Sequence, residues 1–240
     1  MFIDTAFDFR TDAMGGDPDR TSPTLRRYHQ LLWSKGLPNG RRFDLDTTTQ
    51  WTYLHHKSDL GEFYLSSDSV IVTFNGWVST ADLIARIPER EVDWFEYIGY
   101  TIGGMMVFPS NRVGRKHTIN MARGMNRTTI ADRMDLTLEC IRRFYAGDTD
   151  TPLGATLVLY QEFFALFTDF PGFVDFFLLQ DLATHDYSGV RFFMDFDNFK
   201  SSAVPKDLDM YAKFREASIE FVLQRNKRIT AWASQNLSAH

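Results

Sequence analysis

The spacing of apolar residues divides the chain into two parts with different periods. Between residues 41 and 108, apolar and polar residues alternate over short segments that are rich in β-branched and aromatic side chains, as in strands. From Thr118 onward, apolar residues recur every three or four positions, which is the period of an amphipathic helix. The change predicts an α+β fold, in which a small, mostly antiparallel sheet in the N-terminal half is packed by helices from the C-terminal half.

Boundary signals predict individual elements. Ser22 followed by Pro23 is typical of a helix start and Gly36 of a helix end, so a helix is expected over about 23–35. Residues 1–21, which are rich in Asp and Gly, are expected to form a loop or an arm. The same reasoning predicts strands at about 51–56, 61–66, 69–74 and 101–108, and helices at about 80–87, 91–98, 153–168, 172–184 and 206–233, together with a helix capped by Thr128 and Thr129 that continues to Tyr145.

Composition changes this picture in two respects. A chain of 240 residues lies in the upper range for one domain, so we expect a single domain over residues 1–240, with two small domains as the alternative. Phenylalanine is unusually frequent, with 22 residues, and its large rings are expected to dominate the core. The single cysteine, Cys140, excludes an internal disulfide and a CxxC zinc or redox site.

The sequence indicates a cytoplasmic protein without a membrane segment. Asp4 lies where a signal peptide needs a basic region followed by an apolar stretch. No window reaches 18 uninterrupted apolar residues, and the Phe-rich part of the chain is broken repeatedly by Asp and Glu.

Charge is distributed unevenly along the chain, although the net charge is only −5. Residues 20–42 hold six Lys and Arg and no acid, and residues 110–145 hold eight Lys and Arg against three acids, which gives +6 and +5. The stretches 43–109 and 147–211 come to −7 and −8. Overall acidity argues against a protein that coats nucleic acid in general, but two basic segments are compatible with a local pocket for an anion.

Two blocks of residues carry a resemblance to a known family. One block is Ser22–His29 with Leu31–Lys35, and the other is Thr118–Asn120 with Ala122–Gly124 and Asp132–Tyr145. In these blocks the chain resembles a widespread bacterial family of single-domain cytoplasmic proteins known as a domain of unknown function. The resemblance runs through most of the chain and implies no assigned activity or catalytic residue. Met134 stands where an aromatic residue is expected, which is a difference in packing.

The best candidate for chemistry is the basic segment that follows the strand expected at 101–108. Helix N-termini present free N–H groups to anions, and Arg adds planar pairs of donors suited to phosphate or carboxylate. Asn120 and Arg123 are three residues apart, so they share a helix face. The segment therefore predicts an anion site made by Arg112, Lys116, His117, Asn120 and Arg123. The structural alternative is a solvated basic loop, with Arg123 paired to an acid such as Asp132.

The helix expected at 23–35 offers a possible far wall to this site. Arg26 and Trp33 lie on one face of it, a combination that can stack a base while contacting phosphate. We therefore expect Arg26 or Lys35 to supply further contacts to the anion. The alternative is that Trp33 belongs to the core and the basic side chains to the surface.

Other chemical signatures are weak, and no cofactor or metal site is predicted. His55 and His56 are adjacent in an expected strand, so their side chains point to opposite faces and cannot chelate one ion. No dinucleotide-binding, Walker A, nucleophile-elbow, kinase or HExxH motif occurs. Asp132, Asp135 and Glu139 share a helix face that could hold hydrated Mg²⁺, but neighbouring arginines favour salt bridges.

Two hypotheses of function follow. In the first, the protein binds a phosphate-bearing anion, a nucleotide or a nucleic-acid end, through a basic pocket, with or without phosphoryl or nucleotidyl chemistry. In the second, it is a non-enzymatic protein-interaction or defence-accessory protein. The sequence does not decide whether the protein is an enzyme, and it indicates no oligomeric state.

Overall fold

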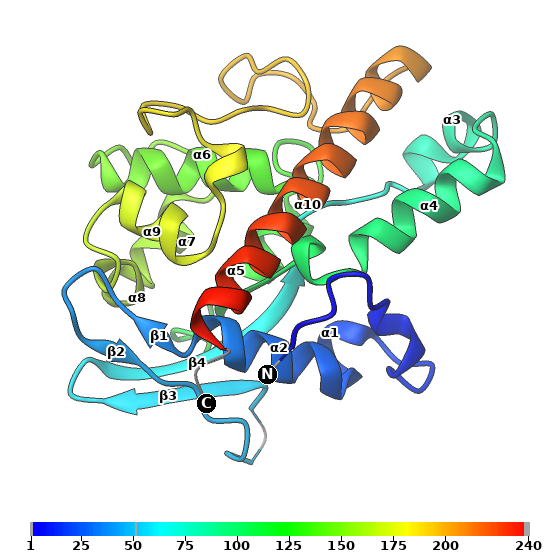
Figure 1. The fold of residues 1–240 in the computed structure, drawn as a ribbon. Helices are drawn as coiled ribbons and strands as arrows, with labels where there is room; N and C mark the ends of the chain where they lie inside the picture. Colours follow the sequence, from blue (N-terminus) through cyan, green and yellow to red (C-terminus); the bar gives the residue numbers. More distant parts are fainter. Residues whose placement is uncertain (1, 51, 238–240) are drawn as a thin grey trace.

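The strands of the molecule form two small antiparallel sheets in the N-terminal half, which confirms the expected α+β class. The computed structural model describes residues 2–50 and 52–237. Strands β1 (Lys35–Gly36) and β2 (Arg42–Phe43) form a two-stranded sheet. Strands β3 (Leu54–Ser58), β4 (Gly61–Ser69) and β5 (Met105–Pro109) form a three-stranded sheet with β4 in the centre (Figure 1).

The expected strand at 69–74 is wrong, because the chain leaves the sheet after Ser69. Val70 donates its N–H to the Gly104 carbonyl (2.9 Å), and its own carbonyl accepts from the Met134 N–H (3.2 Å). Phe74 then adopts a left-handed backbone with φ 59°. The apolar run is therefore buried by contacts with other segments rather than by strand pairing.

Three longer helices follow the sequence signals closely. Helix α2 (Pro23–Trp33) begins as expected, with the Ser22 hydroxyl accepting the Leu25 N–H (3.1 Å). It ends two residues early because Lys35 and Gly36 pair with β2. Helices α4 (Glu89–Gly99) and α10 (Leu208–Asn236) lie at the helices expected over 91–98 and 206–233.

Short helical segments complete the first half of the chain. These segments are the 3₁₀ segments η1 (Phe9–Thr11), η2 (Val78–Thr80) and η3 (Ile102–Gly104), and the helices α1 (Pro18–Thr21), α3 (Ala81–Ile84) and α5 (Ile119–Met125). Two of them, η1 and α1, lie in the region expected to be a loop or an arm. Helix α3 lies within the helix expected at 80–87 and is shorter than predicted.

The helix expected from Thr128 begins later, as α6 (Met134–Tyr145). Ala131 and Asp132 have φ values of 50° and 57°, which a right-handed helix does not allow. The Thr129 hydroxyl does not cap this helix but donates to the Asn126 side chain (2.5 Å). The left-handed turn before α6 sets the position of Asp132.

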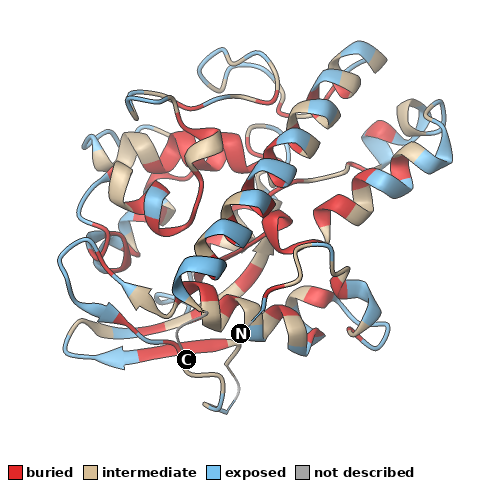
Figure 2. Ribbon diagram, viewed as in Figure 1, coloured by how far each residue is buried: buried red, intermediate tan, exposed pale blue. Residues whose placement is uncertain are grey.

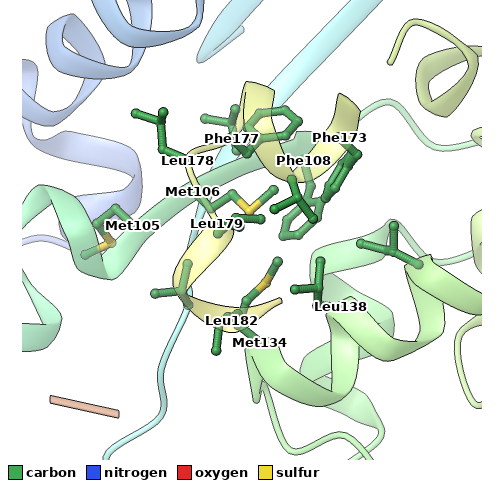
Figure 3. Packing of buried hydrophobic residues seen from close by; sticks show 14 of the residues in the cluster. Met105, Met106, Phe108, Met134, Leu138, Phe173, Phe177, Leu178, Leu179 and Leu182 are labelled. Carbon is green, nitrogen blue, oxygen red and sulfur yellow. The ribbon is translucent and has the colours of Figure 1, made fainter. Parts of the chain in front are cut away.

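The two helices expected at 153–168 and 172–184 are divided into shorter ones. They are α7 (Gly154–Val158), α8 (Gln161–Ala165), α9 (Phe170–Phe176) and the 3₁₀ segment η4 (Gln180–Leu182). Thr168 and Leu178, with φ values of 70° and 55°, break the helical path. The region is nevertheless the apolar centre that its sequence indicates: Phe164, Phe167 and Phe177 are fully buried. Figure 3 shows Phe173 and Phe177 of this region packed beside Phe108 of β5 and Met134 and Leu138 of α6.

Helix α10 is fixed to the sheet through a buried arginine. The Arg225 guanidinium donates to the carbonyls of Gly103 (2.9 Å), Met105 (2.7 Å) and Phe177 (3.0 Å). The helix approaches η3 so closely that a Cβ atom on Gly103 would lie 2.6 Å from the Val222 carbonyl oxygen. Burial lowers the pKa of Arg225 to about 9; the three carbonyls accept from its two Nη groups, whereas its buried Nε has no hydrogen-bond partner among the described residues.

Burial follows this framework (Figure 2). Helix α6 is buried over most of its length, whereas α4 and α10 expose one side to solvent. Buried apolar residues from Ile3 to Ala233 form one connected cluster. Among residues 2–50 and 52–237, no helix has both the length and the apolar character that crossing a membrane requires.

Candidate functional site: an acidic cavity

Arg123, the centre of the predicted anion site, is completely buried and fully bonded. Its Nε donates to the Thr137 hydroxyl (3.0 Å), and its Nη2 donates to the carbonyls of Ser69 (2.9 Å) and Asp132 (2.6 Å). Its Nη1 forms an ion pair with Asp68. The structural alternative is that Arg123 pairs with an acid such as Asp132. In this arrangement the acid is Asp68.

The rest of the predicted segment separates into a buried part and an exposed part. Asn120 donates from its side-chain amide to the Ser66 hydroxyl and the Ser67 carbonyl, both at 3.0 Å. Arg112, Lys116 and His117 lie on the exposed loop between β5 and α5, and Arg112 contacts the Met121 sulfur (3.3 Å). We call residues 110–118 the basic loop.

The two residues expected to form the far wall lie elsewhere. Arg26 donates to the carbonyls of Thr47 (2.6 Å) and Thr52 (2.7 Å). The Lys35 ammonium group lies 4.7–4.9 Å from the ring centroids of Trp33, Phe176 and Trp232. Burial, followed by the nearby Arg225 charge, lowers the pKa of Lys35 to about 7. The seven predicted residues thus occupy four separate places in the fold.

A different site gathers charged groups of the opposite sign. A cavity of about 330 Å³ lies between α1, the end of β4, α4 and the turn before α6. Five acidic side chains line it: Asp17, Asp19, Asp68, Glu96 and Asp132. Arg10 and Tyr100 also contribute to its wall. We call this site the acidic cavity.

Local sequence explains how each segment delivers its carboxylate. Asp17 caps α1 by accepting the Asp19 N–H (3.1 Å), and Pro18 occupies the first helical position. This single helical turn packs against β4 and so brings Asp19 towards the strand. Asp68 lies one residue before the end of β4, and the left-handed turn brings Asp132 to the opposite wall.

Asp19 is held in the cavity with a strongly shifted acidity. Its Oδ1 accepts a hydrogen bond from the Ser67 hydroxyl (3.0 Å). Burial, followed by the negative charges of Asp68 and Asp17, raises the pKa of the Asp19 carboxyl to about 7. The Ser67 hydrogen bond and the Arg123 charge oppose this rise without cancelling it.

Asp68 shows the same behaviour in spite of its ion pair. Burial raises the pKa of its carboxyl to about 6, and the Asp132 charge adds to the rise. The Arg123 guanidinium and the Ser69 N–H act in the opposite direction. The Asp68 charge thus contributes to the raised pKa of Asp19, and both carboxyls titrate near neutral pH.

Tyr53, which lies near Asp19, and its neighbour His29 are polar but uncharged side chains. The Tyr53 hydroxyl lies 3.3 Å from His29 Nδ1. Burial raises the pKa of Tyr53 and lowers the pKa of His29 to about 3, so both side chains are neutral at pH 7.

Cations compensate this charge only in part. Arg10 is shared between Asp8 (2.7 Å) and Glu96 (3.5 Å), and Arg123 pairs with Asp68. Among the ion pairs of residues 2–50 and 52–237, none involves Asp19 or Asp132. The cavity thus combines an excess of carboxyl groups with two pKa values near neutrality, and carboxyls of this kind can accept and return protons at pH 7.

The carboxyls do not form a ready ligand set for a metal ion. Within the described part of the chain, no group of three or more His, Cys, Asp or Glu side chains has the arrangement that would hold one. The Asp132, Asp135 and Glu139 stripe is divided: Asp135 pairs with Arg133 (2.5 Å), and Glu139 pairs with Arg142 and Arg143 (both 2.7 Å). This agrees with the expectation of salt bridges there.

Sequence reasoning missed the acidic cavity. Two signals were available: Asp17 followed by Pro18, which is typical of a helix start, and Asp68 at the end of an alternating strand. Each signal alone describes local structure. Only the fold shows that the two acids, with Asp132, share one cavity.

Comparison with known proteins identifies a family and no activity. A protein-family model described as "Family of unknown function (DUF6994)" matches residues 3–229. No curated protein and no solved structure matches the chain.

Proposed function

Because the chain belongs to this family of unknown function, we propose a function from its structure. The acidic cavity binds the cationic group of a small organic molecule, an amine or a guanidinium. The observation that carries the proposal is the gathering of five carboxyl side chains around about 330 Å³, with Asp19 and Asp132 outside every ion pair of the described residues. The volume lies at the lower end of the range for small-molecule sites, which is about 300–1,000 Å³.

The protonation of the pair supports an organic cation as the ligand. At pH 7 the cavity holds protons on part of the Asp19 and Asp68 population, because burial of the carboxyls and, second to it, repulsion from neighbouring carboxylates oppose full ionisation. An ammonium or guanidinium group removes that repulsion and donates hydrogen bonds to carboxylate oxygens. Binding is therefore coupled to proton release, and affinity rises as pH increases through 6 and 7.

Titration calorimetry with 1,4-diaminobutane and methylguanidine tests the proposal, with 1,4-butanediol as the uncharged probe. The wild type is expected to bind at least one of the cations and to release protons below pH 7, seen as a heat that depends on the buffer. Asp19→Asn and Asp132→Asn should each weaken binding about tenfold, the equivalent of 1.4 kcal/mol. Asp150→Asn makes the same charge change on an exposed residue outside the cavity and should have no effect.

Two results of this titration contradict the proposal. One is the absence of binding for both cations at low salt and pH 8, where the carboxyls are ionised. The other is equal affinity in the wild type and in both cavity variants, which would place the cation elsewhere.

The two functions expected from sequence stay predictions. Binding of a nucleotide or nucleic-acid phosphate by Arg112, Lys116 and His117 now concerns the exposed basic loop. A protein-interaction or defence-accessory role concerns the exposed surface, where Trp94 and Leu223 line a groove between α4 and α10.

A further inference from the structure

A second cavity, lined by other residues, has the opposite character. It lies between the segment that contains η2 and α3, the residues at 127–128, and the chain that enters α10. In Figure 1, α3 and the first turns of α10 lie on the same side of the molecule. The cavity has a volume of about 1200 Å³ and shares no lining residue with the acidic cavity.

Three basic side chains line this second cavity from three separate segments. Arg86 follows α3, Arg127 follows α5, and Lys206 precedes α10; all three are exposed. In the part of the chain that the structure describes, none of them is joined to an acid by an ion pair or a side-chain hydrogen bond. Their mutual repulsion is relieved when an anion binds among them.

This cavity has fewer acidic than basic side chains, and one of the acids already accepts a hydrogen bond. Asp207 caps α10 by accepting the Met210 N–H (2.8 Å). Asp82 lies in the first turn of α3, where the partial positive charge of the helix start stabilises a carboxylate. The cavity wall thus has three cations against two acids, and one of these acids already accepts a backbone hydrogen bond.

Apolar and aromatic side chains form another part of the wall, beside the polar residues Ser79, Thr128 and Ser202. Trp77, Leu83, Val204 and Leu208 line it. The Arg127 guanidinium lies 5.2 Å from the centroid of the Trp77 ring, and Phe74 supports this ring edge-on at 5.3 Å. A tryptophan beside a guanidinium offers an aromatic surface next to a phosphate-binding group.

We propose that this second cavity binds a nucleoside di- or triphosphate, with the phosphates among Arg86, Arg127 and Lys206 and the base against the Trp77 wall. Two or more phosphate groups match three separated cations better than a single phosphate does. The apolar wall accounts for an organic group on the ligand. The site is independent of the basic loop and of the proposed cation site. The proposals about those two regions can each fail without affecting this one.

Fluorescence titration of the full chain tests the proposal, since Trp77 itself reports on its surroundings. ATP is expected to quench the emission in a saturable way, adenosine to bind at least about tenfold more weakly, and added salt to weaken ATP binding. Trp77→Phe should remove the quenching while calorimetry still detects ATP. Arg127→Gln and Lys206→Gln should each weaken ATP about tenfold or more.

Two controls make the test decisive. Lys200→Gln makes the same charge change on an exposed lysine outside the cavity and should bind ATP as the wild type does, and Arg112→Gln tests the basic loop separately. The proposal is overturned if the wild type does not bind ATP at low salt, or if adenosine binds as tightly as ATP. It is also overturned if Arg112→Gln loses binding while the Arg127 and Lys206 variants keep it, because the nucleotide then lies on the basic loop.

Discussion

The acidic cavity and the basic loop carry opposite charges, and the fold holds them in opposite ways. The carboxyls of the cavity come from four segments that are far apart in sequence, and folding encloses them partly, against their mutual repulsion. The basic residues of the loop are neighbours in sequence and remain in open solvent. A run of like charges along this chain therefore marks a solvated surface, whereas like charges brought together from distant segments mark the candidate site.

One member of the predicted basic set lies behind the acidic cavity and not on the basic loop. Arg123 comes from the second basic segment of the sequence, yet it is buried behind the cavity and paired with Asp68. It supplies the positive charge that allows Asp68 to occupy the wall. Arg123 thus stabilises carboxylates in the fold, and its N–H groups donate to partners within the protein.

Removing this support has the largest expected effect. Arg123→Met leaves Asp68 without its cation and leaves the Ser69 and Asp132 carbonyls without their donor, so the free energy of unfolding at pH 7 should fall by roughly 3–5 kcal/mol. Urea unfolding measures the change. The matched variant Arg115→Met, on the basic loop, should stay within about 0.5 kcal/mol of the wild type. A loss below about 1 kcal/mol for Arg123→Met would show that the buried pair does not support the wall.

The next effect depends on pH and follows from the raised pKa of Asp19. The folded protein keeps a proton on Asp19 up to about pH 7, whereas the unfolded chain releases it near its ordinary value of 3.8. Stability from this group is therefore greatest at low pH and falls as pH rises from about 4 to 7. Asp19→Asn, which cannot ionise, should gain stability relative to the wild type over this window, by roughly 2 kcal/mol after allowance for solvent contact.

Urea midpoints of the wild type and Asp19→Asn at pH 4.5, 6 and 7.5 check this window. Asp150→Asn, measured in parallel, should follow the wild type at each pH. A constant difference between wild type and Asp19→Asn across the three pH values would mean that the carboxyl is not destabilised by its surroundings.

The smallest effects are expected on the basic loop. Arg112→Gln and Lys116→Gln remove charge from exposed side chains, so each should change the free energy of unfolding by less than about 0.5 kcal/mol. Neither should change the affinity for 1,4-diaminobutane appreciably. A stability loss above about 1 kcal/mol, measured by urea unfolding, would remove the contrast between the two regions.

The fold was predictable where local chemistry decides it. Ser22 and Pro23 start α2 through a cap and a fixed backbone angle, and Phe63 and Leu65 alternate with less buried neighbours in β4. Both features depend on residues within one element. The strand expected at 69–74 failed for the opposite reason: Val70 bonds to Gly104 of η3 and Met134 of α6, and Phe74 packs against Phe214 of α10, all of which lie far away in sequence.

The candidate site was not predictable in the same way. The raised pKa of Asp19 comes from its burial and from Asp68, which lies almost 50 residues away, and that of Asp68 comes from its burial and from Asp132. Sequence patterning indicates which residues are charged. It does not indicate which charges folding brings into one cavity, and the contiguous basic segments were therefore the stronger signal.

The most direct test of the account is to measure the acidity of the cavity carboxyls themselves. Carbon-13 NMR of the Asp side-chain carboxyls between pH 4 and 9 should show two resonances with midpoints near 7 and 6, and Asp19→Asn should remove the higher one. Saturating 1,4-diaminobutane should move both midpoints to lower pH, because a bound cation favours the ionised forms. If every Asp carboxyl titrates below pH 5 and the diamine shifts none of them, the cavity carboxyls hold no proton near neutral pH, which contradicts the proposed cation site.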